Sequence, residues 1–75
     1  MFEYYTLNFN NNRYLFGVPL NHPGYITTDN PDEAMKWKSK EKAEEFLVQF
    51  EAKNFCHIQK IFTNEEPKYW KNIVG

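Results

Sequence analysis

The side chains able to perform nucleophilic chemistry are few, and their spacing does not favour catalysis. Ser39 and Cys56 are the nucleophile candidates, and His22 and His57 are the two histidines. Ser39 stands where a helix cap belongs, directly before a stretch with helical periodicity. Cys56 and His57 are neighbours in a predicted strand, where successive side chains point to opposite faces and cannot pair. We therefore expect no enzyme, and we interpret Cys56 as a small buried thiol.

Metal and cofactor chemistry also lack a pattern. The histidines, the cysteine and the carboxylates show no spacing such as C-x-x-C or H-x-x-x-H. The paired acids Asp32-Glu33 and Glu65-Glu66 fit a helix start and a solvated turn. Three glycines are too few and too scattered for a phosphate-binding G-x-G-x-x-G loop. We expect no metal site and no cofactor.

Binding chemistry is better represented, because the chain holds seven Phe, five Tyr and two Trp. One helix on three or four strands cannot cover that many aromatic rings, so some should be exposed for binding a protein. The predicted partner-binding residues are Tyr69, Trp70, Lys71 and Lys68 in the C-terminal tail and Tyr14 and Phe16 in an N-terminal hairpin. A second interpretation of the tail, that it folds back to cover the core, stays open.

Single-stranded nucleic-acid binding is the alternative function. Aromatic rings on a hairpin can stack on bases, and lysines can follow a phosphate backbone. The residues for this function would be Arg13, Tyr4, Lys36 and Lys38. A net charge of −1 and eight lysines to one arginine make an electrostatic grip on nucleic acid weak.

Two strands and a turn are predicted at the N-terminus. Residues 2–9 alternate between two faces and are rich in aromatic side chains, which is typical of a strand. Asn10-Asn11-Asn12 predicts a turn, because asparagine tolerates positive φ. A second strand from Arg13 to Val18, ended by Pro19, completes an antiparallel hairpin over residues 1–20. A turn at Pro23-Gly24 precedes a short strand, Tyr25–Thr28.

The rest of the chain predicts one helix and one long strand. Asn30–Met35 carries the residues of a single helical turn, and Lys36-Trp37-Lys38 resumes extended structure with Trp37 pointing inward. Behind Ser39, an apolar stripe predicts a helix over 40–53. Its members are Ala43, Phe46, Leu47 and Phe50. A closing strand follows over 55–63, and then the tail over 64–75. The predicted fold class is α+β, a small antiparallel sheet of three to four strands packed on one amphipathic helix in the order β-β-(β)-α-β.

Length and composition place this fold in one domain over residues 1–75. A single cysteine cannot form an intramolecular disulfide. The longest apolar runs are far shorter than the roughly 18–20 residues that a membrane span needs. The N-terminus lacks the basic start and apolar segment of a signal peptide. We expect a cytoplasmic protein that does not enter a membrane.

The stretch from Thr27 to Leu47 resembles a pattern of small bacteriophage proteins. Its sequence, TTDNPDEAMKWKSKEKAEEFL, matches "T-x-x-P-x-x-A-x-x-aromatic-x-S-x-x-x-A-x-x-F" between an N-terminal hairpin and a closing strand. The resemblance implies an early or accessory protein that binds and blocks a bacterial host or defence protein, an anti-defence role without catalysis. The pattern consists of capping and packing residues, so it transfers no functional residue. A homodimer is compatible with either function.

Overall fold

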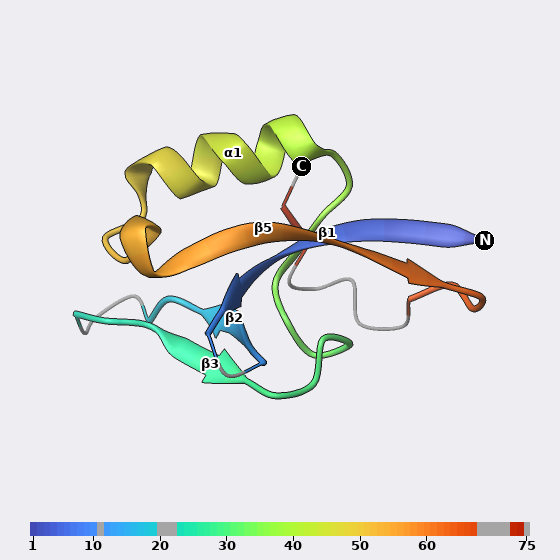
Figure 1. Cartoon of the computed structure of the whole chain (residues 1–75), viewed down its shortest axis with the longest axis horizontal. Helices are drawn as coiled ribbons and strands as arrows, with labels where there is room; N and C mark the ends of the chain where they lie inside the picture. Colours follow the sequence, from blue (N-terminus) through green and yellow to red (C-terminus); the bar gives the residue numbers. More distant parts are fainter. Residues whose placement is uncertain (11, 20–22, 68–72, 75) are drawn as a thin grey trace.

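One sheet with an α-helix across part of one face makes up the fold, in a computed structural model that describes residues 1–10, 12–19, 23–67 and 73–74 (Figure 1). This is the predicted α+β class. The elements are β1 (Phe2–Phe9), β2 (Arg13–Gly17), β3 (Ile26–Thr28), β4 (Lys36–Trp37), α1 (Lys40–Gln49), the short 3-10 helix η1 (Lys53–Phe55), β5 (Cys56–Thr63) and β6 (Ile73–Val74).

β1 is the central strand, and both of its edges pair with other strands. One edge pairs antiparallel with β5 along the whole strand, from Phe2 opposite Thr63 to Phe9 opposite Cys56. The other edge pairs with β4 at Tyr5 and with β2 at Asn8 and Phe9. Beyond these strands, β3 pairs with β2, and β6 runs parallel to β4. The order is therefore β3-β2-β1-β4-β6, with β5 on the opposite edge of β1.

The predicted N-terminal hairpin is confirmed as the pair β1 and β2. Asn12 has a φ of 58°, the left-handed conformation that asparagine tolerates in such turns. β2 ends at Gly17, one residue before the predicted end, and its pairing with β3 shifts between Leu15 and Gly17. β3 begins at Ile26, one residue after the predicted start.

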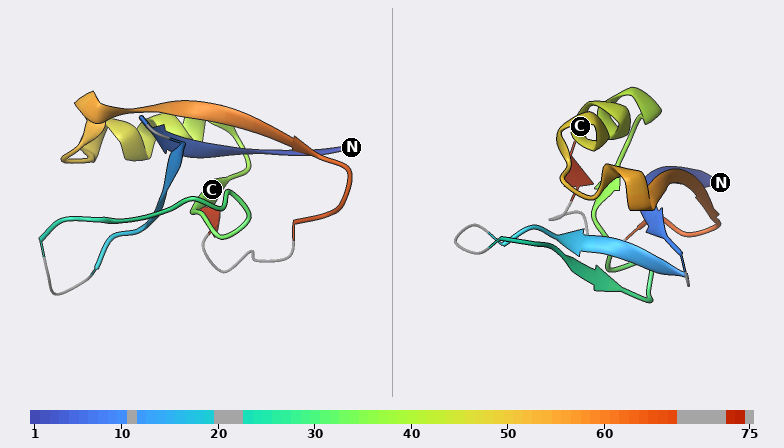
Figure 2. Two further views of the ribbon diagram at one scale, coloured as in Figure 1. Left: turned by 60° about the horizontal axis from the view of Figure 1, so that its bottom comes forward. Right: turned by 60° about the vertical axis from the view of Figure 1, so that its left-hand side comes forward.

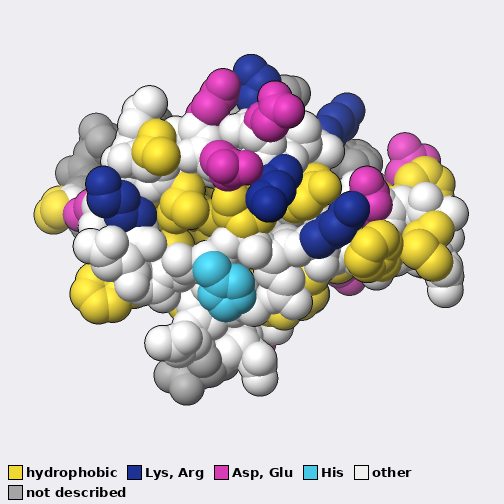
Figure 3. Space-filling model, turned by 45° about the horizontal axis from the view of Figure 1, so that its top comes forward, with side chains coloured by type: hydrophobic (Ala, Val, Ile, Leu, Met, Phe, Trp, Pro, Cys, Tyr) yellow, Lys and Arg dark blue, Asp and Glu magenta, His cyan; other side chains and the backbone are white. Residues whose placement is uncertain are grey.

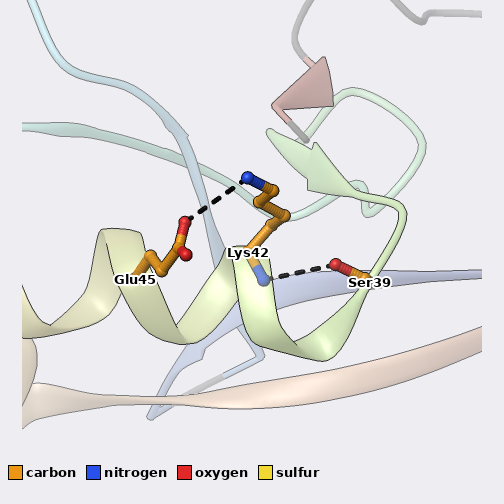
Figure 4. A network of polar contacts seen from close by, with 3 residues as sticks. All are labelled: Ser39, Lys42 and Glu45. Atoms are coloured by element: carbon orange, nitrogen blue, oxygen red, sulfur yellow. Dashed lines mark hydrogen bonds and ion pairs between the residues drawn. The ribbon is translucent and has the colours of Figure 1, made fainter.

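The helix begins as predicted and ends earlier. The Ser39 hydroxyl accepts a hydrogen bond from the backbone N–H of Lys42 at 3.2 Å, and the Lys42 ammonium lies 3.7 Å from Glu45 (Figure 4). The prediction that the helix runs to residue 53 is wrong, because α1 ends at Gln49. Phe50 is extended, with a ψ of 133°.

The early end has a packing reason. Phe50 and Ala52 are both buried, and residues two apart in one α-helix lie about 200° apart around its axis. A continuous helix would point one of the two toward solvent. A turn followed by η1 buries both, and β5 consequently starts at Cys56 instead of residue 55.

The hydrophobic core lies between α1 and the sheet. Its buried members are Leu7, Phe9, Leu15, Trp37, Ala43, Phe50 and Ala52. Trp37 points inward as predicted, and its ring lies 5.1 Å from that of Phe46. The predicted helix stripe is confirmed, since Ala43 and Phe50 are buried and Phe46 and Leu47 pack against the cluster.

A second buried region holds the turn over residues 30–35 against β1. The Tyr4 side chain is buried, and its hydroxyl donates to Asp32 Oδ1 at 3.5 Å. The Lys36 ammonium is also buried, lies 5.4 Å from the centre of the Tyr4 ring, and donates to the carbonyl oxygens of Asp32 and Ala34. Lys36 therefore closes the turn as a structural cation.

Candidate protein-binding surface

The strands β2 and β3 form a two-stranded ribbon that extends away from the layer of α1, β1 and β5 (Figure 2). Four large apolar side chains on it or beside it are exposed. We define the ribbon surface as Phe16, Val18, Tyr25 and Ile26, whose exposed fractions are 37%, 45%, 39% and 49%. Phe16 lies on the face opposite the buried Leu15, whereas Tyr25 shares the face of Leu15 through the pair Leu15–Thr27 and packs on Phe50. Side chains this large usually go to the core of a small domain, so their exposure on both faces of one ribbon suits a partner that wraps around it.

The base of the ribbon is held by polar and apolar contacts. Arg13 donates three hydrogen bonds to Thr27, two to its hydroxyl at 3.1 and 3.2 Å and one to its carbonyl oxygen at 3.0 Å. Leu15 is fully buried, and its carbonyl oxygen accepts from the backbone N–H of Met35 at 2.9 Å. These contacts fix the base of the ribbon, which lowers the entropic cost of binding through it.

Tyr25 connects the ribbon surface to the core. Its ring stacks on Phe9 with centroids 5.0 Å apart and an angle of 5° between the planes, and it meets Phe50 edge-on at 5.4 Å. Gly24 precedes it with a φ of 101°, a conformation that other residues rarely adopt. Tyr25 therefore offers a fixed, half-exposed ring to a partner.

A shallow groove of about 320 Å³ lies beside the ribbon surface. It is lined by Val18, Phe46, Gln49, Phe50 and Glu51, so the end of α1 forms one wall and the end of the ribbon the other. The groove and the ribbon surface share Val18. An apolar side chain of a partner could occupy the groove while the partner covers the ribbon.

Beyond Arg13 at its base, the ribbon carries no formal charge. From residue 14 to residue 28 the sequence has no Asp, Glu, Lys or Arg, although these four types make up 25% of the chain. The face of α1 and β5 in Figure 3 is different, since acidic and basic side chains are interspersed over it. Desolvating an uncharged surface costs little free energy, which favours apolar docking. This uncharged stretch is the sequence signal that could have identified the ribbon surface.

The structure describes two of the six predicted partner-binding residues. Phe16 is exposed and belongs to the ribbon surface, and Tyr14 is half-buried two residues before it. The other four, Lys68, Tyr69, Trp70 and Lys71, lie outside the described residues.

The four residues of the nucleic-acid alternative do not share one surface. Tyr4 and Lys36 are buried, and Arg13 is engaged with Thr27, so only Lys38 is exposed. Burial lowers the pKa of the Lys36 ammonium, and the carboxylates of Asp32 and Glu33 oppose that shift. Lys36 points into the protein, so it cannot contact a phosphate backbone beside Lys38.

Cys56 and His57, two of the candidates for nucleophilic chemistry, have different surroundings. Cys56 is half-buried, with its Sγ 3.5 Å from the carbonyl oxygen of Ala52, and burial raises the pKa of its thiol. His57, the next residue of β5, is exposed. Within the described part of the chain, no group of three or more His, Cys, Asp or Glu side chains is placed to hold a metal ion.

An acidic recess of about 340 Å³ lies between the turn over residues 30–35 and the end of β5. Several of its polar groups are used in turns. Asn30 Oδ1 accepts from the backbone N–H of Asp32, and the Thr63 hydroxyl bonds with the backbone of Glu65. The lining residues are Asn30, Asp32, Glu33, Thr63, Glu65, Glu66 and Pro67.

Comparisons of the chain with models of known protein families, with curated proteins and with solved structures found no match. Across the described residues, no helix has the length and apolar character needed to cross a membrane. Function therefore has to be inferred from the exposed surfaces of the molecule.

Proposed function

We propose that this chain is a non-enzymatic protein-binding module that docks on its partner through the ribbon surface. The observation that carries the proposal is the exposure of four large apolar side chains on an anchored ribbon that is uncharged beyond Arg13 at its base. Burying the exposed parts of four such side chains is worth about 3–4 kcal/mol in total. Because association itself costs free energy of at least this order, stable binding needs further contacts as well. The groove beside Val18 and the aromatic tail residues would add to this.

The resemblance to small bacteriophage proteins supports a bacterial protein as the partner. A bacterial host or defence protein would be bound stoichiometrically in the cytoplasm and inhibited because the module occupies its surface. Tyr69, Trp70, Lys68 and Lys71 remain candidates for a second contact. The alternative, binding of single-stranded nucleic acid, is separated by the same experiment.

The test is an affinity pull-down from bacterial lysate with the tagged chain, performed with and without nuclease. We expect one dominant protein that survives nuclease treatment. A Phe16→Ser, Ile26→Ser double variant should lose this protein, with each substitution weakening binding roughly 5- to 30-fold. The matched control is Val48→Ser, which removes an apolar side chain of 65% exposure from α1 and should retain the protein.

Each contrary outcome has a defined meaning. If the double variant folds and captures the same protein as the unsubstituted chain, the ribbon surface is not the binding site. A Trp70→Ala variant then tests the tail. If capture disappears with nuclease, the nucleic-acid alternative replaces the proposal.

A further inference from the structure

The long strand β5 has an edge that no described strand covers. β5 pairs only with β1 among the described residues, and it does so over all eight of its own residues. The left view of Figure 2 shows β5 running along the outside of β1. The backbone N–H and C=O groups on that outer edge are therefore open to another strand, and a long exposed edge is a template for pairing.

Charged side chains usually keep an exposed edge strand from pairing with another chain, and β5 has few of them. Lys60 is the single charged residue of β5, apart from any charge on His57. Its ammonium turns back over the sheet, 3.3 Å from Glu3 Oε2 on β1 and 5.7 Å from the centre of the Tyr5 ring. Gln59 likewise accepts a hydrogen bond from Asn8 on β1. Both long polar side chains reach inward across the pair β1–β5, which leaves the edge without a charge directed past it.

Two exposed aromatic side chains lie at the ends of this edge. Phe55 directly precedes β5 and is 69% exposed, and Phe62 near its end is 58% exposed. We propose that β5 pairs antiparallel with β5 of a second copy about a two-fold axis, which forms a continuous sheet across a homodimer. Because the start of one strand then meets the end of the other, both aromatic side chains gain a neighbour from the second copy.

Charge and the length of the paired stretch select one register, because only centres at Gln59 and Lys60 keep seven residues of each β5 paired. In antiparallel pairs, opposite residues point to the same face, so a two-fold axis through the sheet requires the paired residue numbers to have an even sum. If the two-fold axis passes through the pair Lys60–Lys60, so that the register is centred at Lys60, two ammonium groups lie opposite each other, which is destabilising. A centre at Gln59 avoids this and still pairs residues 56–62 of both copies. In that register Gln59 faces Gln59, Ile58 faces Lys60, His57 faces Ile61, and Cys56 faces Phe62.

The edge is distinct from the ribbon surface, so this inference does not depend on the proposed function. A homodimer through β5 leaves Phe16 and Ile26 of both copies on β2 and β3, which lie on the other edge of β1. The module would therefore present two ribbon surfaces, one from each copy.

Sedimentation equilibrium of the purified chain tests the association. We expect a monomer–dimer equilibrium at concentrations below roughly 1 mM. Phe62→Ser should weaken the dimer roughly tenfold, because it removes the side chain that faces Cys56 of the second copy. Phe16→Ser is the matched control, the same substitution on the other edge, and should leave the equilibrium unchanged. A chain that stays monomeric up to that concentration overturns the proposal, as does a dimer weakened equally by both variants.

Cysteine crosslinking tests the register. In a Cys56→Ala background, Gln59→Cys places two thiols opposite each other at the two-fold axis, within the roughly 4.4–6.8 Å between Cα atoms that a disulfide spans. Mild oxidation should yield a covalent dimer. Lys60→Cys in the same background is the control, since its two copies lie diagonally, about 8 Å apart, and should not crosslink. Efficient crosslinking of the Lys60→Cys variant alone would overturn the register, and crosslinking of neither would overturn the pairing.

Discussion

Replacing Tyr4 by Phe should change how the stability of the protein depends on alkaline pH. The phenol is buried and donates to Asp32 at 3.5 Å. Burial first, and then the charge and hydrogen bond of Asp32, raise the pKa of Tyr4 from 10.0 to about 12. The folded protein therefore keeps this proton in a pH range where the unfolded chain releases it.

The magnitude follows from linkage. A pKa that rises from 10.0 to about 12 corresponds to about 3 kcal/mol of folding free energy. Water around the exposed carboxylate of Asp32 screens part of this, so we expect about 2 kcal/mol. This contribution is fully present below pH 10 and is lost as pH rises toward about 12, because a raised folded-state pKa means that the folded state binds more protons there.

The contribution of Lys36 to stability changes with pH in the opposite direction. Comparing the unsubstituted protein with the Tyr4→Phe variant cancels this contribution. Burial lowers the pKa of Lys36 below 10.5, so its contribution to stability increases as pH rises through the range below that value. Tyr4→Phe keeps the ring next to the Lys36 ammonium. The effect of Lys36 is therefore nearly the same in both proteins and cancels in their difference.

The assay is urea unfolding of the unsubstituted protein and the Tyr4→Phe variant at a series of pH values. Near neutral pH the variant should be less stable by about 0.5–1 kcal/mol, because it loses a long hydrogen bond. Above pH 10 the unsubstituted protein should lose about 2 kcal/mol relative to the variant, so that the two stability curves cross. Parallel curves across this range would refute the burial of the Tyr4 hydroxyl.

Three further predictions concern local features of the fold. Ser39→Ala should cost about 1 kcal/mol of unfolding free energy in urea titrations by removing the helix cap, whereas Ser39→Asp should restore most of it; equal loss in both would argue against the cap. Gly24→Ala should lower stability by about 1 kcal/mol because of its φ of 101°, while Gly17→Ala, with open space around its Cβ position, should change stability little by the same measurement. Cys56 should react with a thiol reagent more slowly in the folded protein than in urea, because burial raises its pKa; equal rates would contradict its burial.

Local signals in the sequence were enough to locate most elements. The alternation over residues 2–9, the asparagine turn and the cap at Ser39 each depend on residues within a few positions of one another. The inward orientation of Trp37 was predictable as well, since a large apolar residue between two lysines in an extended stretch has one face to bury. In each case the deciding interactions lie within one element.

Features that depend on distant partners were not predictable in the same way. The end of α1 at Gln49 was decided by the need to bury both Phe50 and Ala52, which requires knowing where β5 begins. Lys36 looked like a surface lysine, and its burial depends on the carbonyl oxygens of the preceding turn and on the ring of Tyr4 from β1.

The sequence alone determined that this chain forms hairpin strands, one capped amphipathic helix and a closing strand, because periodicity and capping act over short distances. Tertiary structure decided which apolar residues remain exposed. Leu15 and Phe16 are adjacent and both apolar, yet one is fully buried and the other belongs to the ribbon surface. The two side chains point to opposite faces because they are neighbours in β2. Which face is buried is decided only when β2 and β3 join the sheet beside β1 and Leu15 packs into the core.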